Sequence, residues 1–546
     1  MVSALGAWWV PRSGERLLPV VSALLLVACA PPLHPVALPF VALVPLALFV
    51  AGRSPDAHGR AAAVRGGLLF GAVYFGLLVH WVLALVGYSA WAVPAWIGAV
   101  LLLSSVGGLV TWVAHRGLHG TRAPVWLVVP VAWTAGEWFR AHWPGPLAFP
   151  WMELGVSLTA VPEMVGVAEV VGTRGVGFWI AAVNGLLAQA VLDAPRRIRW
   201  SAVAALVLIV PAAWGVWRAG TLEVRPAVRV AVVQPGIPQE TRLRPAAATA
   251  ATFASLDRLL PSVPPGSVDL VVLPEAVVSA YPELPGGRGA LRRLIGYART
   301  AGAPVLFGAF GASEAGPGTK VHNSAFVVDS SGLRPFRYDK QYLVPAVEAG
   351  GLVPGAPWLP GGLRGGFTPG RESSLVDVGG VRFAPMICYE SAHARAAVDA
   401  RRGGADVLVN LTNDAWFGGQ AFRSRSGALW QHPAHAVMRA IETRAGLVRA
   451  ANTGRTMIVD PTGRVAASLP RFEPGVLVGE VSTTDVRTAF VRWGDLAGNG
   501  AAAAASLLVA VSALGARRRE RGTSGPGSEG PVRPSTPSLD PTDSRS

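Results

Sequence analysis

The sequence predicts a multi-span α-helical membrane domain joined to an α/β domain, and two observations carry this prediction. First, 51% of the 546 residues are hydrophobic and only 15% are charged, whereas soluble domains carry about 25% charge. The deficit falls in residues 1–217 and in a short stretch near the end, where long apolar runs occur. Second, residues 218–492 alternate β-branched runs with helix-compatible stretches, which is typical of α/β architecture.

Seven apolar runs before residue 218 and one after the α/β region are long enough to suggest membrane spans. We place them at 17–32, 35–51, 66–88, 90–114, 124–140, 176–193, 200–217 and 493–516. The expected organisation is therefore a seven-span domain at 1–217, an α/β domain at 218–492, and an eighth helix at 493–516. The tail at 517–546 is rich in Arg, Ser, Pro and Gly, and we expect it to be disordered and cytoplasmic.

Arginines in alternate loops predict how the chain crosses the membrane. Basic loops face the cytoplasm, so both termini should lie inside and the 218–492 domain outside, which makes that domain extracytoplasmic. The net charge of +15 is then a topology signal, and no nucleic-acid partner is expected. The basic residues of these loops are Arg12, Arg16, Arg53, Arg60, Arg65, Arg116, Arg122, Arg196, Arg197, Arg199, Arg517, Arg518, Arg519 and Arg521.

The chain has two cysteines and two lysines, and their positions narrow the possible chemistry. Cys29 lies in an apolar run and Cys388 in the α/β region, so neither a disulfide nor a zinc cluster is expected. The lysines are Lys320 and Lys340, in a chain whose other basic residues, histidines aside, are all arginines.

One connection, residues 137–175, is longer and more charged than a simple turn between spans. It contains Glu137, Arg140, Glu163 and Arg174 together with several Trp and Phe residues. Charges beside a membrane are costly unless they are paired or face water. The segment is therefore either an interfacial loop with aromatic anchors or the lining of a lipid-facing cavity.

The α/β region shows eight strand-like runs, and reactive side chains stand near the ends of three of them. Glu275 and Cys388 end two runs, and Lys340 follows a third. A carboxylate could take the thiol proton, the thiolate could attack a carbonyl carbon, and the ammonium could stabilise the oxyanion. The strand-like runs are 228–239, 268–276, 304–310, 323–329, 381–390, 405–414, 447–460 and 475–481, and the helix-like stretches are 241–260, 288–301, 391–403 and 432–445.

Each of the three residues also has a purely structural interpretation. Cys388 alone would more often be a small buried hydrophobe, Glu275 could cap a helix, and Lys340 could be a surface charge. A Cys–His pair is a further alternative. The histidines that could supply it are His322, His393, His432 and His435.

The sequence around these residues resembles the Glu-Lys-Cys triad of the nitrilase superfamily. Together with the spans, it is similar to the apolipoprotein N-acyltransferase family within that superfamily. This resemblance covers roughly residues 10–515 and implies an αββα sandwich for the α/β domain. The segments that carry it are LPEA with Glu275, YDKQYLVPAVE with Lys340, MICYES with Cys388, NLTNDAWFG at 410–418, RAIETRAGLVRAANTGRTMIVDPTG at 439–463 and PVAWTAGEWFRAHWPGPLAFPWMELG at 130–155.

The resemblance implies a role for each matching position. Glu275 would be the general base, Lys340 the oxyanion stabiliser and Cys388 the nucleophile. The supporting residues would be Glu348, eight positions after the lysine, and Tyr389 and Glu390, which follow the nucleophile. Trp416 and Phe417 would form a mobile aromatic loop where the acyl chain enters. The sequence departs from the family at PAVE (345–348), at Leu273 and at Leu243.

The resemblance also implies a reaction and a location in the bacterial inner or plasma membrane. A membrane phospholipid would donate a fatty acyl chain to Cys388 as a thioester. The α-amino group of a diacylated apolipoprotein would then accept that chain, and the reaction would need no metal or organic cofactor. Two alternatives remain at this point: a membrane-tethered amidase or nitrilase, and a membrane scaffold for another enzyme.

Overall fold

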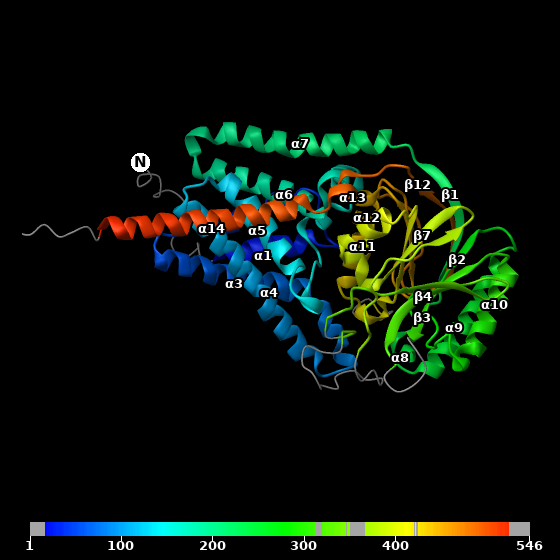
Figure 1. Cartoon of the computed structure of the whole chain (residues 1–546). Helices are drawn as coiled ribbons and strands as arrows, with labels where there is room; N and C mark the ends of the chain where they lie inside the picture. Colours follow the sequence, from blue (N-terminus) through cyan, green and yellow to red (C-terminus); the bar gives the residue numbers. More distant parts are fainter. Residues whose placement is uncertain are drawn as a thin grey trace, which may run out of the picture.

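The computed structural model describes residues 17–312, 319–345, 347–349, 366–419, 421 and 424–523. A bundle of helices lies beside a two-sheet domain, and the last helix, α14, returns from that domain into the bundle (Figure 1). The helices of the bundle are α1 (Leu18–Cys29), α2 (Val44–Ala51), α3 (Ala57–Leu78), α4 (Ala92–His115), α5 (Val125–Ala141), α6 (Ala168–Leu192), α7 (Arg197–Thr221) and α14 (Leu496–Thr523).

Five of these helices are long and apolar enough to cross a bilayer: α3, α4, α6, α7 and α14. The runs expected at 17–32 and 35–51 instead form shorter helices, whereas the run at 124–140 forms α5 at almost its expected bounds. Residues 31–45 contain five prolines, and proline cannot donate a backbone hydrogen bond inside a helix. Helices α1 and α2 are consequently only 12 and 8 residues long. Helix α5 has 17 residues and carries the charged pair Glu137 and Arg140.

Two helices start earlier than their apolar runs indicated. Helix α3 begins at Ala57 instead of 66, because the Asp56 carboxylate accepts a hydrogen bond from Gly59 N at 2.7 Å and caps the helix. It ends at Leu78, and the 3-10 segment η3 (His80–Gly87) follows where the span was expected to continue. Helix α6 begins at Ala168 instead of 176, since Glu169 and Arg174 in its first turns have partners inside the protein.

The last helix also differs from its expected bounds. Helix α14 runs from Leu496 to Thr523, so it extends past residue 516 into the stretch expected to be disordered. The remainder of the tail, 524–546, lies outside the described residues, as do Arg12 and Arg16 at the other end.

The α/β domain contains two six-stranded sheets. Their strand orders are β12-β1-β2-β3-β4-β5 and β11-β10-β9-β8-β7-β6. Each sheet mixes parallel central pairs, such as β1 with β2 and β7 with β8, with antiparallel outer pairs. The strands are β1 (Arg225–Gln234), β2 (Leu270–Val272), β3 (Val305–Ala312), β4 (Val321–Val328), β5 (Leu333–Asp339), β6 (Val376–Val378), β7 (Val381–Ile387), β8 (Val407–Thr412), β9 (Gly446–Ala451), β10 (Met457–Val459), β11 (Val465–Ser468) and β12 (Gly475–Thr483).

All eight strand-like runs contain a strand, and three strands were not expected. The run at 447–460 splits into β9 and β10, and β5, β6 and β11 were missed. Strand β5 carries Arg, Pro and Asp in a seven-residue stretch, and β6 and β11 have only three and four residues. Such short or polar edge strands lack the run of β-branched residues that marks a central strand.

The sheets and helices form four layers, so the predicted αββα sandwich is confirmed. Side chains from both sheets, such as Val232 and Val409, pack against each other in one core. The other face of the first sheet packs on α9 (Pro245–Leu259) and α10 (Arg288–Ala301). The other face of the second sheet packs on α11 (Ala394–Arg402) and α12 (Ala428–Thr443). The short helices α8 (Gln239–Arg242) and α13 (Ala489–Trp493) complete the domain.

The α11–α12 layer shares one hydrophobic core with the membrane bundle. The loop and helix start at 137–175 form much of the contact. Their charges are paired: Arg174 Nη2 lies 2.7 Å from Glu153 Oε1, and Arg464 Nε lies 2.6 Å from Glu163 Oε1. The Glu169 carboxylate forms ion pairs with Arg218 and Arg444. The segment is therefore a packed interface between the two parts of the protein.

Candidate active site

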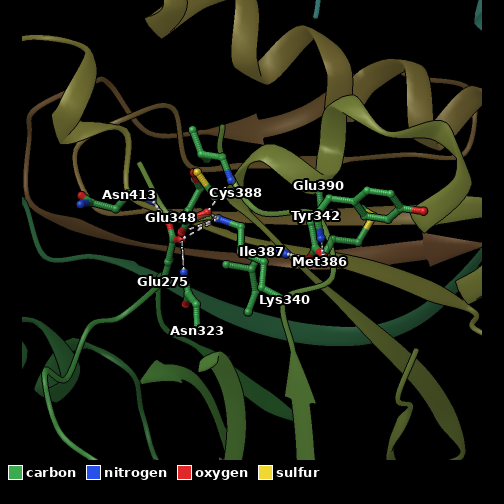
Figure 2. Close-up of polar contacts among 12 residues, drawn as sticks. Glu275, Asn323, Lys340, Tyr342, Glu348, Met386, Ile387, Cys388, Glu390 and Asn413 are labelled. Atoms are coloured by element: carbon green, nitrogen blue, oxygen red, sulfur yellow. Dashed lines mark hydrogen bonds and ion pairs between the residues drawn. The ribbon is translucent and has the colours of Figure 1, made fainter. Parts of the chain in front are cut away.

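The three residues singled out from the sequence meet between the two sheets. Glu275 follows β2 and Lys340 follows β5, both in the first sheet, whereas Cys388 follows β7 in the second. Glu348 reaches the same point from the loop after Lys340. Figure 2 shows Glu275, Lys340, Glu348 and Cys388 converging at one place. All four side chains are buried.

Lys340 lies between two carboxylates. Its Nζ is 3.3 Å from Glu275 Oε1 and 2.8 Å from Glu348 Oε2. The Lys340 side chain has no solvent exposure. A buried ammonium is tolerated when opposite charges compensate it, and here two carboxylates do so. The lysine is thereby fixed in position and in charge.

Two further groups fix the carboxylates. Asn323 Nδ2 donates to Glu275 Oε1 at 2.7 Å and to Glu348 Oε1 at 3.1 Å, so one amide joins both acids. The backbone N–H of Asn413 donates to Glu275 Oε2 at 2.8 Å. Glu348 Oε2 also accepts from Val344 N at 2.9 Å. Because Asn323 is in β4 and Asn413 follows β8, both sheets hold the site together.

Burial and charge set the protonation of the lysine and the thiol. Burial lowers the pKa of Lys340, but the carboxylates of Glu348 and Glu275 outweigh it and hold that pKa above its usual value. Burial raises the pKa of the Cys388 thiol well above its usual value, and the Glu275 carboxylate adds to this while Lys340 opposes it. At neutral pH the site therefore holds an ammonium and an un-ionised thiol, and the thiol needs a base before it can attack.

Cys388 has an unusual backbone conformation. Its φ is 53°, in the left-handed region that non-glycine residues rarely adopt. It sits where β7 ends and the 3-10 segment η11 (Cys388–Ala392) begins. Such strain persists only where the surrounding contacts impose it, and here the turn presents the side chain between the sheets.

Glu390 supports this turn and lies away from the lysine and the two carboxylates around it (Figure 2). Its carboxylate accepts four hydrogen bonds: from Ile387 N at 2.6 Å, Tyr338 Oη at 2.7 Å, Gln341 N at 2.6 Å and Tyr342 N at 3.1 Å. The first of these partners precedes the nucleophile and the last two follow Lys340. Glu390 therefore ties the turn at Cys388 to the loop that carries the lysine.

Aromatic side chains from both parts of the protein surround the site. Tyr389 stacks on Phe149 and Trp151, with ring centroids 6.3 and 6.2 Å apart. The segment η12 (Asp414–Phe417) carries the two residues expected in an aromatic loop. Phe417 meets Trp81 edge-on at 5.3 Å, and Trp416 meets Tyr88 edge-on at 6.1 Å. Trp81 belongs to η3, which thus packs on the loop expected at the acyl-chain entrance.

The histidines considered for a Cys–His pair have other partners. His432 Nδ1 lies 2.8 Å from Asp414 Oδ1, and its Nε2 lies 3.0 Å from the carbonyl oxygen of Cys388. The ring of His393 stacks on Tyr342 at 4.2 Å. His435 Nε2 lies 3.4 Å from Met152 N, and His322 Nδ1 lies 3.6 Å from Asp339. Among the described residues, no group of three or more His, Cys, Asp and Glu side chains could hold a metal ion.

Several residues of the site gave no signal in the sequence. Asn323 lies in a strand-like run, and its amide could not be assigned to the two acids from spacing. Trp151 was noted only as part of a loop motif, yet it packs beneath Tyr389 with 1% exposure. Their roles depend on contacts between segments far apart in the chain, which a single sequence does not reveal.

Comparison with known proteins places both parts of the chain. Residues 22–186 match the family model for the apolipoprotein N-acyltransferase N-terminal domain, and residues 229–489 match that for carbon-nitrogen hydrolases. Apolipoprotein N-acyltransferase of Geobacter metallireducens is 30% identical over 93% of this chain and 96% of its own length. The Azotobacter vinelandii protein of the same name is 32% identical over 95% and 99%, and that of Ralstonia nicotianae is 34% identical over 78% and 80%.

The two family models occur in the same order as the two parts of the structure, and two of these relatives align over more than nine tenths of the chain. Apolar helices and bacterial relatives together identify a bacterial membrane protein. The chain belongs to the apolipoprotein N-acyltransferase family.

Proposed function

We propose that this protein transfers a fatty acyl chain from a membrane phospholipid to the N-terminal amino group of a diacylated apolipoprotein, through a thioester on Cys388. The names of its relatives support the overall reaction. One structural observation carries the assignment of residues. A buried ammonium held between two carboxylates lies beside an un-ionised buried thiol in a strained turn.

In the first half-reaction, Glu275 accepts the thiol proton as Cys388 Sγ attacks the ester carbonyl carbon of the phospholipid. The ammonium of Lys340 stabilises the negative charge that develops on the carbonyl oxygen. As the tetrahedral intermediate collapses, the C–O bond to the glycerol breaks. Glu275 returns its proton to that oxygen, and a lysophospholipid leaves.

In the second half-reaction, the neutral α-amino group of a diacylglyceryl-cysteine attacks the thioester carbonyl. Glu275 takes a proton from the nitrogen as the C–N bond forms. The C–S bond breaks and the thiolate of Cys388 recovers the proton from Glu275. The balance of the two steps is one ester consumed and one amide formed. Side chains supply the base, the nucleophile and the charge stabilisation, so the reaction requires no metal or organic cofactor.

Glu348 and Asn323 position the charged groups in this scheme. Glu348 accepts from Lys340 and from Val344 N, so it fixes the ammonium while Glu275 acts as the base. Tyr389 and Glu390 support the turn of the nucleophile, as their contacts with the membrane-side aromatics and the lysine loop suggest. We assign Trp416 and Phe417 to the passage through which the acyl chain reaches Cys388.

The membrane helices fit substrates that are both lipid-anchored. An acyl chain brought through water would cost about 0.8 kcal/mol per methylene. A catalytic domain at the bilayer surface avoids this cost. With the arginine pattern of the loops, both termini lie in the cytoplasm and the α/β domain lies at the outer leaflet.

The test uses full-length protein with phospholipid and a diacylated lipopeptide. Mass spectrometry should detect an acyl adduct on Cys388 with phospholipid alone and an N-acylated lipopeptide when both are present. The Cys388→Ala variant should form neither product. The Cys29→Ala variant, which changes the chain's other cysteine, located in α1, should form both. An adduct that persists in Cys388→Ala contradicts the assignment. Release of ammonia from small amides with no lipopeptide product would instead indicate an amidase.

A further inference from the structure

The carbonyl oxygen of Cys388 is held by side chains from three segments. His432 Nε2 lies 3.0 Å from it, Asn410 Nδ2 donates to it at 3.3 Å, and Ser391 Oγ donates at 3.1 Å. All three donors bind the carbonyl group of Cys388, the residue whose φ lies in the left-handed region. The carbonyl of the strained turn is therefore held by its own hydrogen-bond donors, which are distinct from the groups that surround the sulfur.

His432 is itself fixed by a chain of charged groups. Asp414 Oδ1 lies 2.8 Å from its Nδ1, and Arg449 Nη2 donates to Asp414 Oδ2 at 2.7 Å. Arg449 Nη2 also lies 3.2 Å from His432 Nδ1, and Thr412 Oγ1 donates to Asp414 Oδ1 at 3.0 Å. The side chains of His432, Asp414 and Arg449 are at most 1% exposed. These three linked side chains are thus shielded from water.

The contacts show which partner each ring nitrogen of His432 faces. A carbonyl oxygen can only accept, so His432 Nε2 carries a proton. Burial would raise the pKa of Asp414, but Arg449 and His432 lower it far below its usual value. Asp414 is therefore a carboxylate, and it lies on the Nδ1 side of the ring together with Arg449. The ring donates from Nε2 to the Cys388 carbonyl while these two charged groups fix it from the other side.

The position of His432 joins three parts of the protein. Asp414 opens η12, the segment that carries Trp416 and Phe417. Phe417 meets the His432 ring edge-on at 5.8 Å. Trp151 from the membrane-side loop lies 5.6 Å from the same ring. One imidazole thus contacts the nucleophile's carbonyl, the aromatic loop and the membrane-side aromatics.

We propose that His432 is a positioning residue for Cys388: the Arg449–Asp414–His432 chain holds the carbonyl of the strained turn and so keeps the sulfur aligned with Glu275 and Lys340. Its action is through the backbone, since His432 contacts the Cys388 carbonyl. This proposal deepens the function proposed above and rests on it for the acylation step. A displacement of about 1 Å at a reacting group can lower a rate by about 100-fold, so the contact has kinetic consequences.

Two substitutions separate the two ring contacts. The amide nitrogen of an asparagine reaches about as far as Nδ1, whereas that of a glutamine reaches about as far as Nε2. His432→Asn keeps the contact with Asp414 and loses the contact with Cys388. His432→Gln keeps a donor for the Cys388 carbonyl. A matched control is His435→Asn, one turn along α12, because His435 also packs on Trp151, at 5.0 Å, but contacts Met152 N instead of the nucleophile.

The experiment measures two rates in full-length protein carrying Cys29→Ala, so that Cys388 is the only thiol. The first is the single-turnover rate of acyl-Cys388 formation from phospholipid. The second is the rate of Cys388 alkylation by iodoacetamide, which needs no acyl donor and so distinguishes failure of this proposal from failure of the proposed function. We expect His432→Asn to lower both rates at least tenfold, His432→Gln to stay within about threefold, and His435→Asn within about twofold.

Equal rates in His432→Asn and His432→Gln, with unchanged thermal unfolding midpoints, would overturn the proposal. So would a His435→Asn variant as slow as His432→Asn. If His432→Asn does not fold, Asp414→Asn provides the test. It keeps a side chain of the same size beside Nδ1 but removes the charge that pairs with Arg449 and fixes the ring, so His432 is no longer held against the Cys388 carbonyl. Asp414→Asn should then be at least tenfold slower in alkylation, and a rate equal to that of the wild type contradicts the proposal.

Discussion

The two helical layers of the sandwich are built very differently. In α12, every residue except Trp430 is buried. In α10, on the opposite face, only Leu294, Ala298 and Ala301 are buried. Both helices cover a six-stranded sheet, so the sandwich itself does not explain the difference. The membrane bundle does, because it packs against α12 where α10 meets solvent (Figure 1).

The buried face of α12 is also strongly polar. Arg439 Nε lies 2.9 Å from Glu442 Oε2, and both residues are at most 1% exposed. Thr173 in α6 contacts both: its N–H donates to Glu442 Oε1 at 2.7 Å, and its Oγ1 accepts from Arg439 Nη2 at 2.6 Å. Arg439 Nη1 also donates to Ala392 O at 3.4 Å. Buried charges must be paired and hydrogen-bonded, and here α6 completes the pairing. The membrane bundle is therefore part of the fold of the α/β domain.

The largest expected effect lies between the layers, at the site itself. Lys340→Met should lower the rate of acyl-Cys388 formation by about 1,000-fold, since it removes the charge that stabilises the oxyanion in the proposed reaction. The chain offers a matched control in its other lysine. Lys320→Met, at an exposed position before β4, should change the rate less than twofold. Comparable losses of rate in both variants would mean that the positive charge of a lysine affects the rate without lying at the site.

The next effect compares the layers directly. Arg439→Met should lower the free energy of unfolding by about 3–5 kcal/mol, because it leaves the buried Glu442 carboxylate without its partner. Arg293→Met in α10 removes a pair with Asp257 that lies at 2.5 Å but is about half exposed. That change should cost at most about 1 kcal/mol. Thermal or denaturant unfolding in detergent measures both, and similar losses would refute the distinction between the layers.

The smallest effect tests the contribution of α6 to α12. Thr173→Val is nearly isosteric, and it should cost about 1–3 kcal/mol because Arg439 and Glu442 each lose a hydrogen bond in a buried setting. Thr300→Val in α10 removes a hydroxyl that donates to Gly296 O at 3.1 Å on an exposed surface. Its expected cost is within about 0.5 kcal/mol. The difference between the two unfolding free energies isolates the contact between the domains.

The sequence predicted the class of fold well, for physical reasons, and it singled out three residues that the structure brings together. Central strands are buried on both faces, so their β-branched runs are visible, and Glu275, Cys388 and Lys340 follow strands. The short strand β6 and the polar strand β5 lack such a pattern. Apolar runs revealed membrane helices but not their starts, since α3 begins with a cap at Asp56 and α6 with paired charges.

The supporting contacts of the site were beyond the sequence. Asn323 and Asp414 look like ordinary polar residues at strand ends, and their partners come from distant segments. His432 was considered as a partner for the sulfur, whereas the structure places its Nε2 at the carbonyl oxygen. Such contacts depend on how the sheets and α12 are arranged in three dimensions, which spacing in one chain does not determine.

The shared core of α12 and the membrane bundle has a consequence for how the protein is made. Helix α6 emerges from the ribosome before α12, so the bilayer-inserted bundle can present Thr173 and its apolar neighbours when the second sheet forms. Strand β12, near the end of the chain, then pairs with β1, which directly follows the bundle. A fragment that contains only the α/β domain would expose the polar and apolar face of α12 together. We expect such a fragment to aggregate during expression instead of yielding a soluble enzyme.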